Sequence, residues 1–402
     1  MALGIGGCAP VTDEQIAGEA SSESRAGQWE IATPTRESSF APALEVQDGE
    51  LLLSWLEPIE GDSGSRAHRF RVARRGPGGW STPVTVAQGE DFFANWADIP
   101  RIAAVANRAL VAHWLAKTDE ETYAYSIFLA RSDDGGESWR VLGRLNDDAT
   151  PTEHGFVSYV AEGDAARVFW LDGRRMTDGG DMTLRTALVT RSVAAGELLD
   201  DRVCECCATD AAMTDGGPVV VYRDRSADEI RDIGSIRRLE DGWGPSVPVA
   251  DDGWRIEGCP VNGPVVAASG RHLSVVWYTA GQDHPRVEAA LSDDAGATYR
   301  TVGVVDSGRP LGRSDIVADG SGGFVISWLE GADVDAEIRL RRLRSTGDLS
   351  EPLVVARTSP SRASGFPQVQ RIEESIFVAW VDIDGTDATR VRLLEIPLSA
   401  VG

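Results

Sequence analysis

Seven short apolar runs along the chain each end on an aromatic residue and then turn polar. Successive aromatic residues are separated by 51 to 59 residues. Period-two alternation, many Val and Ile residues and Gly- or Asp-containing turns favour strands over helices in every repeat. A β unit of about 50 residues cannot bury its own apolar face and has to stack on its neighbours. The pattern predicts an all-β, seven-bladed β-propeller with four-stranded blades. The aromatic residues are Trp55, Trp114, Trp170, Tyr222, Trp277, Trp328 and Trp380.

The first strand of each repeat is expected to line the central channel. The last repeat supplies only three clear strands, whereas residues 28–35 form a strand-like segment without a partner in their own repeat. Because an open ring would leave a sheet edge unpaired, we expect 28–35 to complete the seventh blade. The prediction is one propeller domain over 28–402, closed by an N-terminal strand. The inner strands are predicted at 40–46, 98–105, 155–161, 206–213, 262–268, 314–319 and 366–372.

Residues 1–27 differ in character from the rest of the chain. The run Ile5-Gly6-Gly7-Cys8 resembles a bacterial lipobox, in which Cys8 is acylated after a signal peptide is removed, although no basic region or full hydrophobic region precedes it. Either the start lies further upstream or the match is accidental, and we expect the former. A stretch rich in Ser, Glu and Ala follows, which is typical of a disordered linker. The prediction is an exported lipoprotein of the bacterial periplasm or outer surface, held at the membrane only by this anchor.

The formal net charge of −24 narrows the classes of partner. Nucleic acids and anionic membrane surfaces bind basic faces, so neither is expected as a partner. A surface of this charge also repels copies of itself, and we expect a monomer. A small-molecule or glycan ligand is the class of partner that remains.

Two turns, one in the second repeat and one in the fifth, share the pattern Ser-x-Asp-x-Gly-x-x-aromatic. The Ser hydroxyl and Asp carboxylate are expected to bind backbone amides of the turn, Gly to adopt a positive φ, and the aromatic ring to pack into the blade. This pattern resembles the Asp-box, or bacterial neuraminidase repeat, of the sialidase superfamily. The resemblance implies a propeller fold, and in that family these turns are structural and lie away from the active site. The residues are Ser132, Asp134, Gly136 and Trp139, and Ser292, Asp294, Gly296 and Tyr299.

The residues that sialidases need for catalysis are matched less well in this chain than the Asp-box turns are. Sialidases have six blades, an arginine triad, a Tyr nucleophile paired with Glu, an Asp acid/base and a Phe/Tyr-Arg-Ile-Pro motif. This chain has Ile99-Pro100-Arg101-Ile102, in which the motif residues are out of order. No Tyr/Glu pair can be assigned from the sequence, so no catalytic residue is predicted.

Four cysteines interrupt the repeat at the entry to the fourth and fifth inner strands. Equivalent positions in adjacent blades meet at one mouth of the channel, so we expect their sulfur atoms to converge. Three interpretations stay open, and they are not exclusive: disulfides, a thiolate site for copper or zinc with His154 as a further ligand, and a redox-active disulfide. The cysteines are Cys204, Cys206, Cys207 and Cys259.

Polar residues at the same mouth are candidates for binding an anionic ligand. Arginine side chains hold carboxylates with two parallel hydrogen bonds, although Arg–Asp pairs can instead tie neighbouring blades together. The candidates are Arg223, Arg225, Asn262, Arg313 and Asp315.

The segments 204–212, 219–233, 252–264 and 362–369 resemble a group of exported bacterial proteins described as sialidase-like, over about residues 30–400. No reaction follows from that resemblance. The leading hypothesis is an envelope-anchored propeller that binds a glycan or other anionic group, with or without a metal, at the mouth lined by the cysteines. The alternatives are an exo-sialidase-type glycoside hydrolase and a periplasmic protein that handles copper or redox equivalents.

Overall fold

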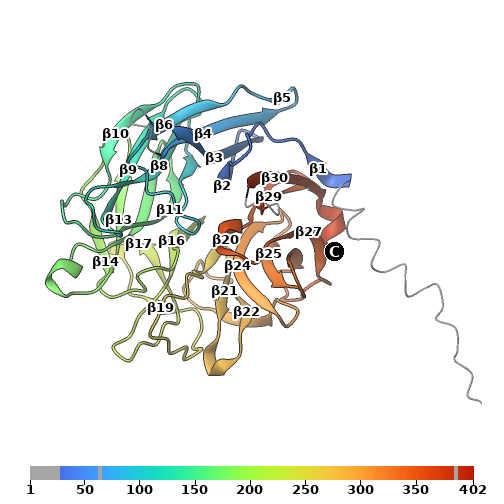
Figure 1. Cartoon of the computed structure of the whole chain (residues 1–402). Helices are drawn as coiled ribbons and strands as arrows, with labels where there is room; N and C mark the ends of the chain where they lie inside the picture. Colours follow the sequence, from blue (N-terminus) through green and yellow to red (C-terminus); the bar gives the residue numbers. More distant parts are fainter. Residues whose placement is uncertain (1–27, 62–65, 384–387) are drawn as a thin grey trace, which may run out of the picture.

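The strands of the seven repeats form seven separate antiparallel sheets arranged in a ring (Figure 1). The computed structural model describes residues 28–61, 66–383 and 388–402. Each sheet is one blade, and its strands follow the chain outward from the channel. The prediction of a seven-bladed β-propeller is confirmed.

The first three blades come from the N-terminal half of the chain. Blade 1 contains β2 (Phe40–Gln47), β3 (Glu50–Glu60), β4 (Arg66–Gly76), β5 (Gly79–Trp80) and β6 (Val84–Gly89); blade 2 contains β7 (Arg101–Ala104), β8 (Leu110–Lys117), β9 (Tyr125–Ser132) and β10 (Arg140–Arg144); blade 3 contains β11 (His154–Glu162), β12 (Ala165–Asp172), β13 (Thr183–Val189) and β14 (Glu197–Asp200).

The other four blades complete the ring. Blade 4 contains β15 (Asp210–Thr214), β16 (Gly217–Arg223), β17 (Ile233–Leu239), β18 (Gly242–Trp243) and β19 (Val247–Pro248); blade 5 contains β20 (Val265–Ser269), β21 (His272–Thr279), β22 (Arg286–Ser292) and β23 (Arg300–Val304); blade 6 contains β24 (Pro310–Ala318), β25 (Phe324–Gly331), β26 (Ala336–Leu343) and β27 (Leu353–Thr358); blade 7 contains β28 (Gln368–Ile372), β29 (Ser375–Ile383) and β30 (Thr389–Pro397).

The seventh blade takes its fourth strand from the other end of the chain. β1 (Glu30–Ile31) pairs antiparallel with β30, with Glu30 opposite Leu394 and Ile31 opposite Leu393. The side chain of Arg392 forms an ion pair with Glu30 next to this ladder. The predicted closure by an N-terminal strand is confirmed, and the outer edge of β30 is covered where closure occurs.

The hydrophobic core lies between the blades. It consists of seven clusters, and each cluster joins side chains of two neighbouring blades, including one that joins blade 7 to blade 1. The seven repeat aromatics lie on the second strands and are buried. Several place their polar atom on a carboxylate: Trp170 Nε1 donates to Asp172 and Trp328 Nε1 to Glu330, at 2.8 and 2.7 Å. The repeat is therefore visible in the sequence because each blade has to fill the same space against its neighbour.

Carboxylates on the inner strands connect consecutive blades around the channel. Oδ2 of Asp98, Asp210 and Asp315 accepts the backbone N–H of Phe156, Val266 and Val369, each at 2.7 to 2.8 Å and each in the next blade. Burial raises the pKa of these groups, to about 8 for Asp98, about 6 for Asp210 and about 7 for Asp315.

Glu45, on the first inner strand, links its blade to the next one in the same way. It faces the backbone amide of Ala104 in blade 2, and burial raises its pKa to about 7. A cavity of about 40 Å³ remains in the channel, lined by Arg101, Asp210 and Asp315 among others. The inner wall of the ring is thus a set of side-chain-to-backbone links as well as packed strands.

Both Asp-box turns have the hydrogen bonds that the sequence predicts. They join β9 to β10 and β22 to β23. In the second turn, Ser292 Oγ accepts the N–H of Gly296 at 2.9 Å, and Asp294 accepts the N–H of Thr298 at 2.9 Å. In the first turn, the hydrogen bond from Ser138 leads the contacts that lower the pKa of Asp134 to about 2. Strand direction alternates along each blade, so these turns lie on the face opposite the one where the inner strands begin.

The remaining described elements are short 3-10 helices, and none of the helices in the described ranges is long and apolar enough to cross a bilayer. These helices are η1 (Met176–Asp178), η2 (Gly281–Asp283), η3 (Arg362–Ser364) and η4 (Leu398–Val401). The proposed lipid attachment at Cys8 lies outside the described residues.

Candidate functional site at the channel mouth

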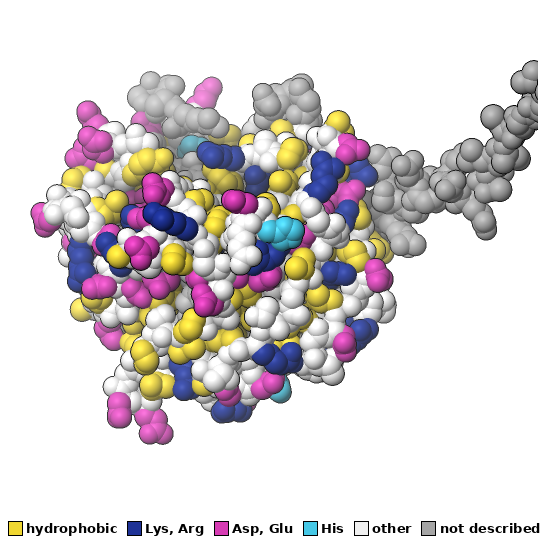
Figure 2. Space-filling view, turned by 90° about the horizontal axis from the view of Figure 1, so that it is seen from below, with side chains coloured by type: hydrophobic (Ala, Val, Ile, Leu, Met, Phe, Trp, Pro, Cys, Tyr) yellow, Lys and Arg dark blue, Asp and Glu magenta, His cyan; other side chains and the backbone are white. Residues whose placement is uncertain are grey.

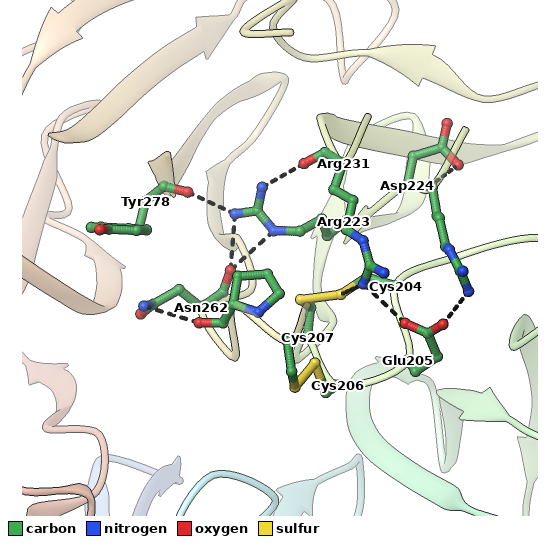
Figure 3. Close-up of a disulfide and its surroundings, with 12 residues drawn as sticks. Cys204, Glu205, Cys206, Cys207, Arg223, Asp224, Arg231, Asn262 and Tyr278 are labelled. Atoms are coloured by element: carbon green, nitrogen blue, oxygen red, sulfur yellow. Dashed lines mark hydrogen bonds and ion pairs between the residues drawn. A yellow bond between two sulfur atoms is a disulfide. The ribbon is translucent and has the colours of Figure 1, made fainter. Parts of the chain in front are cut away.

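The loops that lead into the inner strands all emerge on one face of the ring. The loops between second and third strands emerge on the same face, because strand direction alternates within a blade. This face therefore holds the cysteine segments, the candidate arginines and a cleft. Figure 3 shows the part formed by blades 4 and 5.

The four cysteines converge, as the sequence predicts, and they form two disulfides. Cys204 is bonded to Cys207 within the loop before β15, and Cys206 is bonded to Cys259 in the loop before β20 (Figure 3). The Sγ atoms of Cys204, Cys206 and Cys207 all lie within 4.8 Å of one another. With both disulfides formed none of the four sulfurs is a thiolate, so the predicted copper or zinc site concerns the reduced protein.

A network of charged side chains surrounds the first disulfide. Nη1 of Arg231 lies 3.3 Å from Sγ of Cys204 and 2.9 Å from Oε2 of Glu205. Arg225 forms ion pairs with Glu205 and Glu229, and Arg231 binds Glu229 as well. The hydrogen bonds from Arg225 and Arg231 lower the pKa of Glu229 to about 2. The guanidinium of Arg225, a predicted ligand-binding group, is thus held by carboxylates of its own chain.

Arg223 ties blade 4 to blade 5. Its side chain is buried and donates to the backbone oxygens of Arg231, Asn262 and Tyr278 at 2.6, 2.9 and 2.7 Å (Figure 3). The guanidinium also lies over the ring of Trp254, 4.9 Å from its centroid. Burial lowers the pKa of Arg223 to about 10. Backbone carbonyls occupy its donors, as expected for a group that joins blades.

Asn262 and Arg313 continue this line of contacts around the ring. Oδ1 of Asn262 accepts the backbone N–H of Arg313 at 2.8 Å, which joins blade 5 to blade 6. Nη1 of Arg313 donates to the oxygen of Ser361 and to Oγ of Ser364, both at 2.8 Å, in the loop that leads to blade 7. Of the five candidates for ligand binding, Arg223, Asn262 and Arg313 lie in one chain of contacts, whereas Asp315 lies inside the channel.

His154 lies in a group separate from the cysteines. Its Nδ1 contacts the carbonyl oxygens of Tyr125 and Thr152, and its Nε2 lies 3.2 Å from Asp148 Oδ1 and 3.7 Å from Asp172 Oδ1. Burial lowers the pKa of His154, but the two carboxylates outweigh burial and the net shift is upward. The cysteine sulfurs and this histidine form separate groups of possible metal ligands.

The cation between these two carboxylates is an arginine. Nε of Arg174 lies 2.6 Å from Asp172 Oδ1, and Nη2 lies 3.3 Å from Asp148 Oδ1. The structure therefore gives the carboxylates beside His154 a partner from the chain itself.

A cleft of about 640 Å³ opens on the same face over blades 1, 2 and 7. Trp96 and Phe366 stack in its wall with ring centroids 5.8 Å apart, and Arg362 lies over the Trp96 ring at 5.8 Å. Arg362 is exposed and has no acidic partner among the described residues. Phe40, Phe93 and the exposed Tyr123 complete the aromatic lining.

Sequence reasoning missed this cleft. The sequence does contain a signal for the cleft, because the aromatic residues Phe93 and Trp96 precede one inner strand and Phe366 precedes another. They lie outside the repeated aromatic positions of the second strands, and only the ring brings blade 7 beside blade 2 across the mouth.

A tyrosine of blade 2 pairs with a glutamate at the entry to blade 3, although the sequence did not show it. The hydroxyl of Tyr125 donates to Oε1 of Glu153 at 2.5 Å, and burial raises the pKa of Glu153 to about 7. Phe93 stacks on Tyr125 with centroids 4.0 Å apart, and Tyr125 has no exposed surface. The pair lies beneath the cleft and does not open into it in this structure.

No protein-family model matches the chain, and no curated protein is similar in sequence. Solved structures do share the fold. An α-L-arabinanase of Penicillium chrysogenum is 15% identical with a TM-score of 0.51, over 91% of this chain and 95% of that one. An α-L-arabinofuranosidase of Fusarium graminearum is 14% identical with a TM-score of 0.54, over 93% and 97%. A sialidase of Trypanosoma rangeli is 13% identical with a TM-score of 0.51, over 84% and 59%. The chain therefore has a sialidase-like β-propeller fold, with seven blades.

Proposed function

We propose that the protein binds an acidic glycan at the channel mouth, in the cleft over blades 1, 2 and 7. The observation that carries this proposal is the aromatic wall of the cleft with Arg362 beside it, a cation that has no acidic partner among the described residues. Flat aromatic rings such as Trp96 and Phe366 offer apolar faces to a sugar ring, and an exposed guanidinium such as Arg362 can hold a carboxylate with two parallel hydrogen bonds. The proposed site is on the face where the inner strands begin, but on blades other than those of the cysteines, where the sequence analysis expected the ligand.

Binding is favoured over hydrolysis because, among the residues that the structure describes, none lining the cleft carries a carboxyl group to perform the chemistry. Glycoside hydrolases use two carboxyl groups, or a tyrosine with a carboxylate, on either side of the bond that is cut. None of the described residues lining the cleft is an aspartate or a glutamate. Asp98, which lies below it, accepts a backbone N–H and is buried.

The solved structures with this fold support a glycan as the ligand class. The P. chrysogenum arabinanase was solved with arabinobiose, and an ulvan lyase with a TM-score of 0.57 to this chain was solved with a disaccharide that contains glucuronic acid. At identities of 11 to 15% they support only the class of ligand, not its identity.

Calorimetric titration with an acidic and a neutral disaccharide tests the proposal. We expect a glucuronate-containing disaccharide to bind more tightly than arabinobiose. Trp96→Ala should weaken both by about 5-fold or more, because a stacked ring is worth about 1 kcal/mol or more. Arg362→Gln should weaken only the acidic sugar, by about 10-fold or more, because hydrogen bonds to charged groups are worth about 1.5 to 3 kcal/mol.

Arg344→Gln is the matched control, since Arg344 is an exposed arginine at the turn after β26, on the opposite face. It should leave both affinities unchanged. Equal losses in Arg362→Gln and Arg344→Gln, or no binding of either sugar by the unchanged protein, would overturn the proposal.

Exo-sialidase-type hydrolysis remains a second candidate because of the Tyr125–Glu153 pair. It would require Phe93 to move so that Tyr125 can reach a sugar. Release of the fluorophore from a fluorogenic sialoside measures it. Activity in the unchanged protein that Tyr125→Phe abolishes would support it, and absence of release would exclude this reaction.

We also propose that the protein is exported and anchored through Cys8. Incorporation of labelled fatty acid and fractionation of cells test this. We expect label in the unchanged protein, and neither label nor membrane fractionation in Cys8→Ser. Label that persists in Cys8→Ser would contradict it.

A further inference from the structure

Four cysteine sulfur atoms from two blades lie at the channel mouth, and three of them lie within 4.8 Å of one another. Three of them come from residues 204–207, and the fourth comes from Cys259 in the next blade through its bond to Cys206. The loop of Cys259 is held independently of that bond, because Arg223 of blade 4 donates to the oxygen of Asn262, three residues further along. The sulfurs are thus kept together by packing and hydrogen bonds as well as by the disulfides.

The spacing of the three sulfurs in residues 204–207 is compatible with a tetrahedral metal ion, for which Cys259 would have to move closer as the fourth ligand. Zinc–thiolate bonds of about 2.3 Å in a tetrahedron place the sulfurs about 3.8 Å apart. The Sγ atoms of Cys204, Cys206 and Cys207 already lie within 4.8 Å of one another. Reduction breaks both S–S bonds, after which side-chain rotation can bring the four sulfurs to that spacing.

The surroundings suit bound thiolates. Arg231 is buried and directs Nη1 at Sγ of Cys204 from 3.3 Å, so an N–H donor and a positive charge face the sulfur. Hydrogen bonds from groups that contact a metal-bound ligand hold that ligand in place and favour its ionised form. Arg225 offers a comparison, because it shares the carboxylates Glu205 and Glu229 with Arg231 but, in the part of the chain that the structure describes, makes no contact with a sulfur.

Solvent reaches the site from one side. Cys259 is exposed and Cys206 half-buried, whereas Cys204 and Cys207 are buried. A dithiol reductant can attack the outer disulfide first: two thiols of the reductant become its disulfide, and their two hydrogens pass to Cys206 and Cys259. A second dithiol reduces Cys204 and Cys207 in the same way. Each thiol then loses a proton when its sulfur binds a metal.

We propose that the reduced protein binds one thiophilic d¹⁰ cation, Zn²⁺ or Cu⁺, through Cys204, Cys206, Cys207 and Cys259. His154 is not a ligand, because it is held in a separate group with Asp148 and Asp172. The site is independent of the glycan cleft and of any reaction there.

The test uses the full chain with Cys8→Ser, which removes the remaining thiol outside the site. The protein is reduced under anaerobic conditions and titrated with Co²⁺ as a coloured probe for Zn²⁺, and with Cu⁺ against a competing chelator. We expect one equivalent of Co²⁺, with thiolate charge-transfer absorption that Zn²⁺ removes; the competition with Cu⁺ ranks the two cations. The oxidised protein should bind neither.

Two pairs of variants make the result specific. Cys259→Ser should weaken binding by at least about 10-fold and reduce the charge-transfer intensity, whereas His154→Gln should change neither. Arg231→Gln should shift the charge-transfer band and weaken binding by about 10-fold, whereas Arg225→Gln should leave the band unchanged. Circular dichroism of every reduced protein reports whether it is folded.

Three results would overturn the proposal: no Co²⁺ or Cu⁺ binding by the folded, reduced protein; binding that Cys259→Ser leaves intact; or unfolding of the unchanged chain on reduction. In the last case the sulfurs would be held together only by their two bonds. Failure of the glycan titration would leave this result unaffected, because the two sites share no residue.

Discussion

At the scale of single residues, the arginines at the channel mouth mainly bind other groups of the same chain. Arg223 and Arg313 are buried and donate to backbone oxygens, and Arg225 is held by two carboxylates. A buried guanidinium without a carboxylate is retained only where enough acceptors compensate for its lost hydration. By contrast, Arg362 is exposed beside Trp96, and exposure is what leaves an arginine available to a ligand.

A stability measurement separates these two kinds of arginine. Arg223→Met should lower the free energy of unfolding by about 2 to 4 kcal/mol, because buried carbonyl oxygens lose their donors. Arg225→Gln should lower it by less than about 1 kcal/mol, since its pairs are partly exposed. Urea unfolding followed by tryptophan fluorescence gives both values. Similar losses in the two variants would mean that Arg223 does not tie the blades together.

At the scale of elements, the two-residue strand β1 determines whether the ring has an open edge. Without it, β30 would present unpaired N–H and C=O groups on its outer side. The strand is short, but it brings Trp29, Glu30 and Ile31 against blade 7, where Trp29 and Ile31 pack on neighbouring clusters.

Ile31→Pro tests the role of this strand. Proline removes a backbone N–H from the pairing and constrains φ, so we expect a lower melting temperature and a tendency to self-associate. Differential scanning calorimetry and size-exclusion chromatography measure these effects. Ile31→Val is the control, because it keeps the backbone donor and most of the side chain. If the proline variant melts and elutes as the unchanged protein does, closure does not depend on β1.

At the scale of the whole molecule, acidic and basic side chains are interspersed on the surface, whereas buried carboxyl groups gather in the channel. Figure 2 shows acidic and basic side chains interspersed over the face in view, without one dominant basic patch. Inside, Glu45, Asp98, Asp210 and Asp315 have pKa values raised to between about 6 and 8 by burial. These four interior carboxyl groups therefore titrate near neutral pH.

This predicts a protein that is more stable at mildly acidic pH than at alkaline pH. A carboxyl with a raised folded pKa stays protonated in the folded state while the unfolded chain has lost its proton. Its contribution is complete below the unfolded pKa of about 4 and is lost as the pH rises through the folded pKa. Each such group lowers stability by about 1.4 kcal/mol per pH unit in that interval.

Unfolding midpoints in urea should therefore fall between about pH 5 and 8. Asp98→Asn keeps an oxygen for the N–H of Phe156 but cannot ionise, so its profile should be flatter. Asp134→Asn on the opposite face is the control: the pKa of Asp134 is about 2, so its stabilisation is lost only on acidification below about pH 4. A rise in stability from pH 5 to 8 would contradict the prediction.

The sequence predicts the fold well because the fold is a repeat. The seven aromatic positions indicate seven equivalent interfaces between blades. The segment near residue 30, which has no partner in its own repeat, indicates how the ring is closed. The meeting of Cys206 with Cys259 also follows from equivalent positions in adjacent blades. The pairing of the four cysteines does not follow, because it depends on distances within one loop, nor does the cleft, because Trp96 and Phe366 meet only across the closed ring.

The pairing of β1 with β30 has a consequence for how the chain could be rearranged. The two ends of the propeller pair within one sheet. The seam, the place where the ring is closed, therefore depends on where the chain begins and not on how the blades pack. A circular permutant that joins the two ends and begins at another loop between blades would keep all seven interfaces, with its new termini at the new seam. The architecture is therefore a closed topology in which the position of the first residue is, in principle, free.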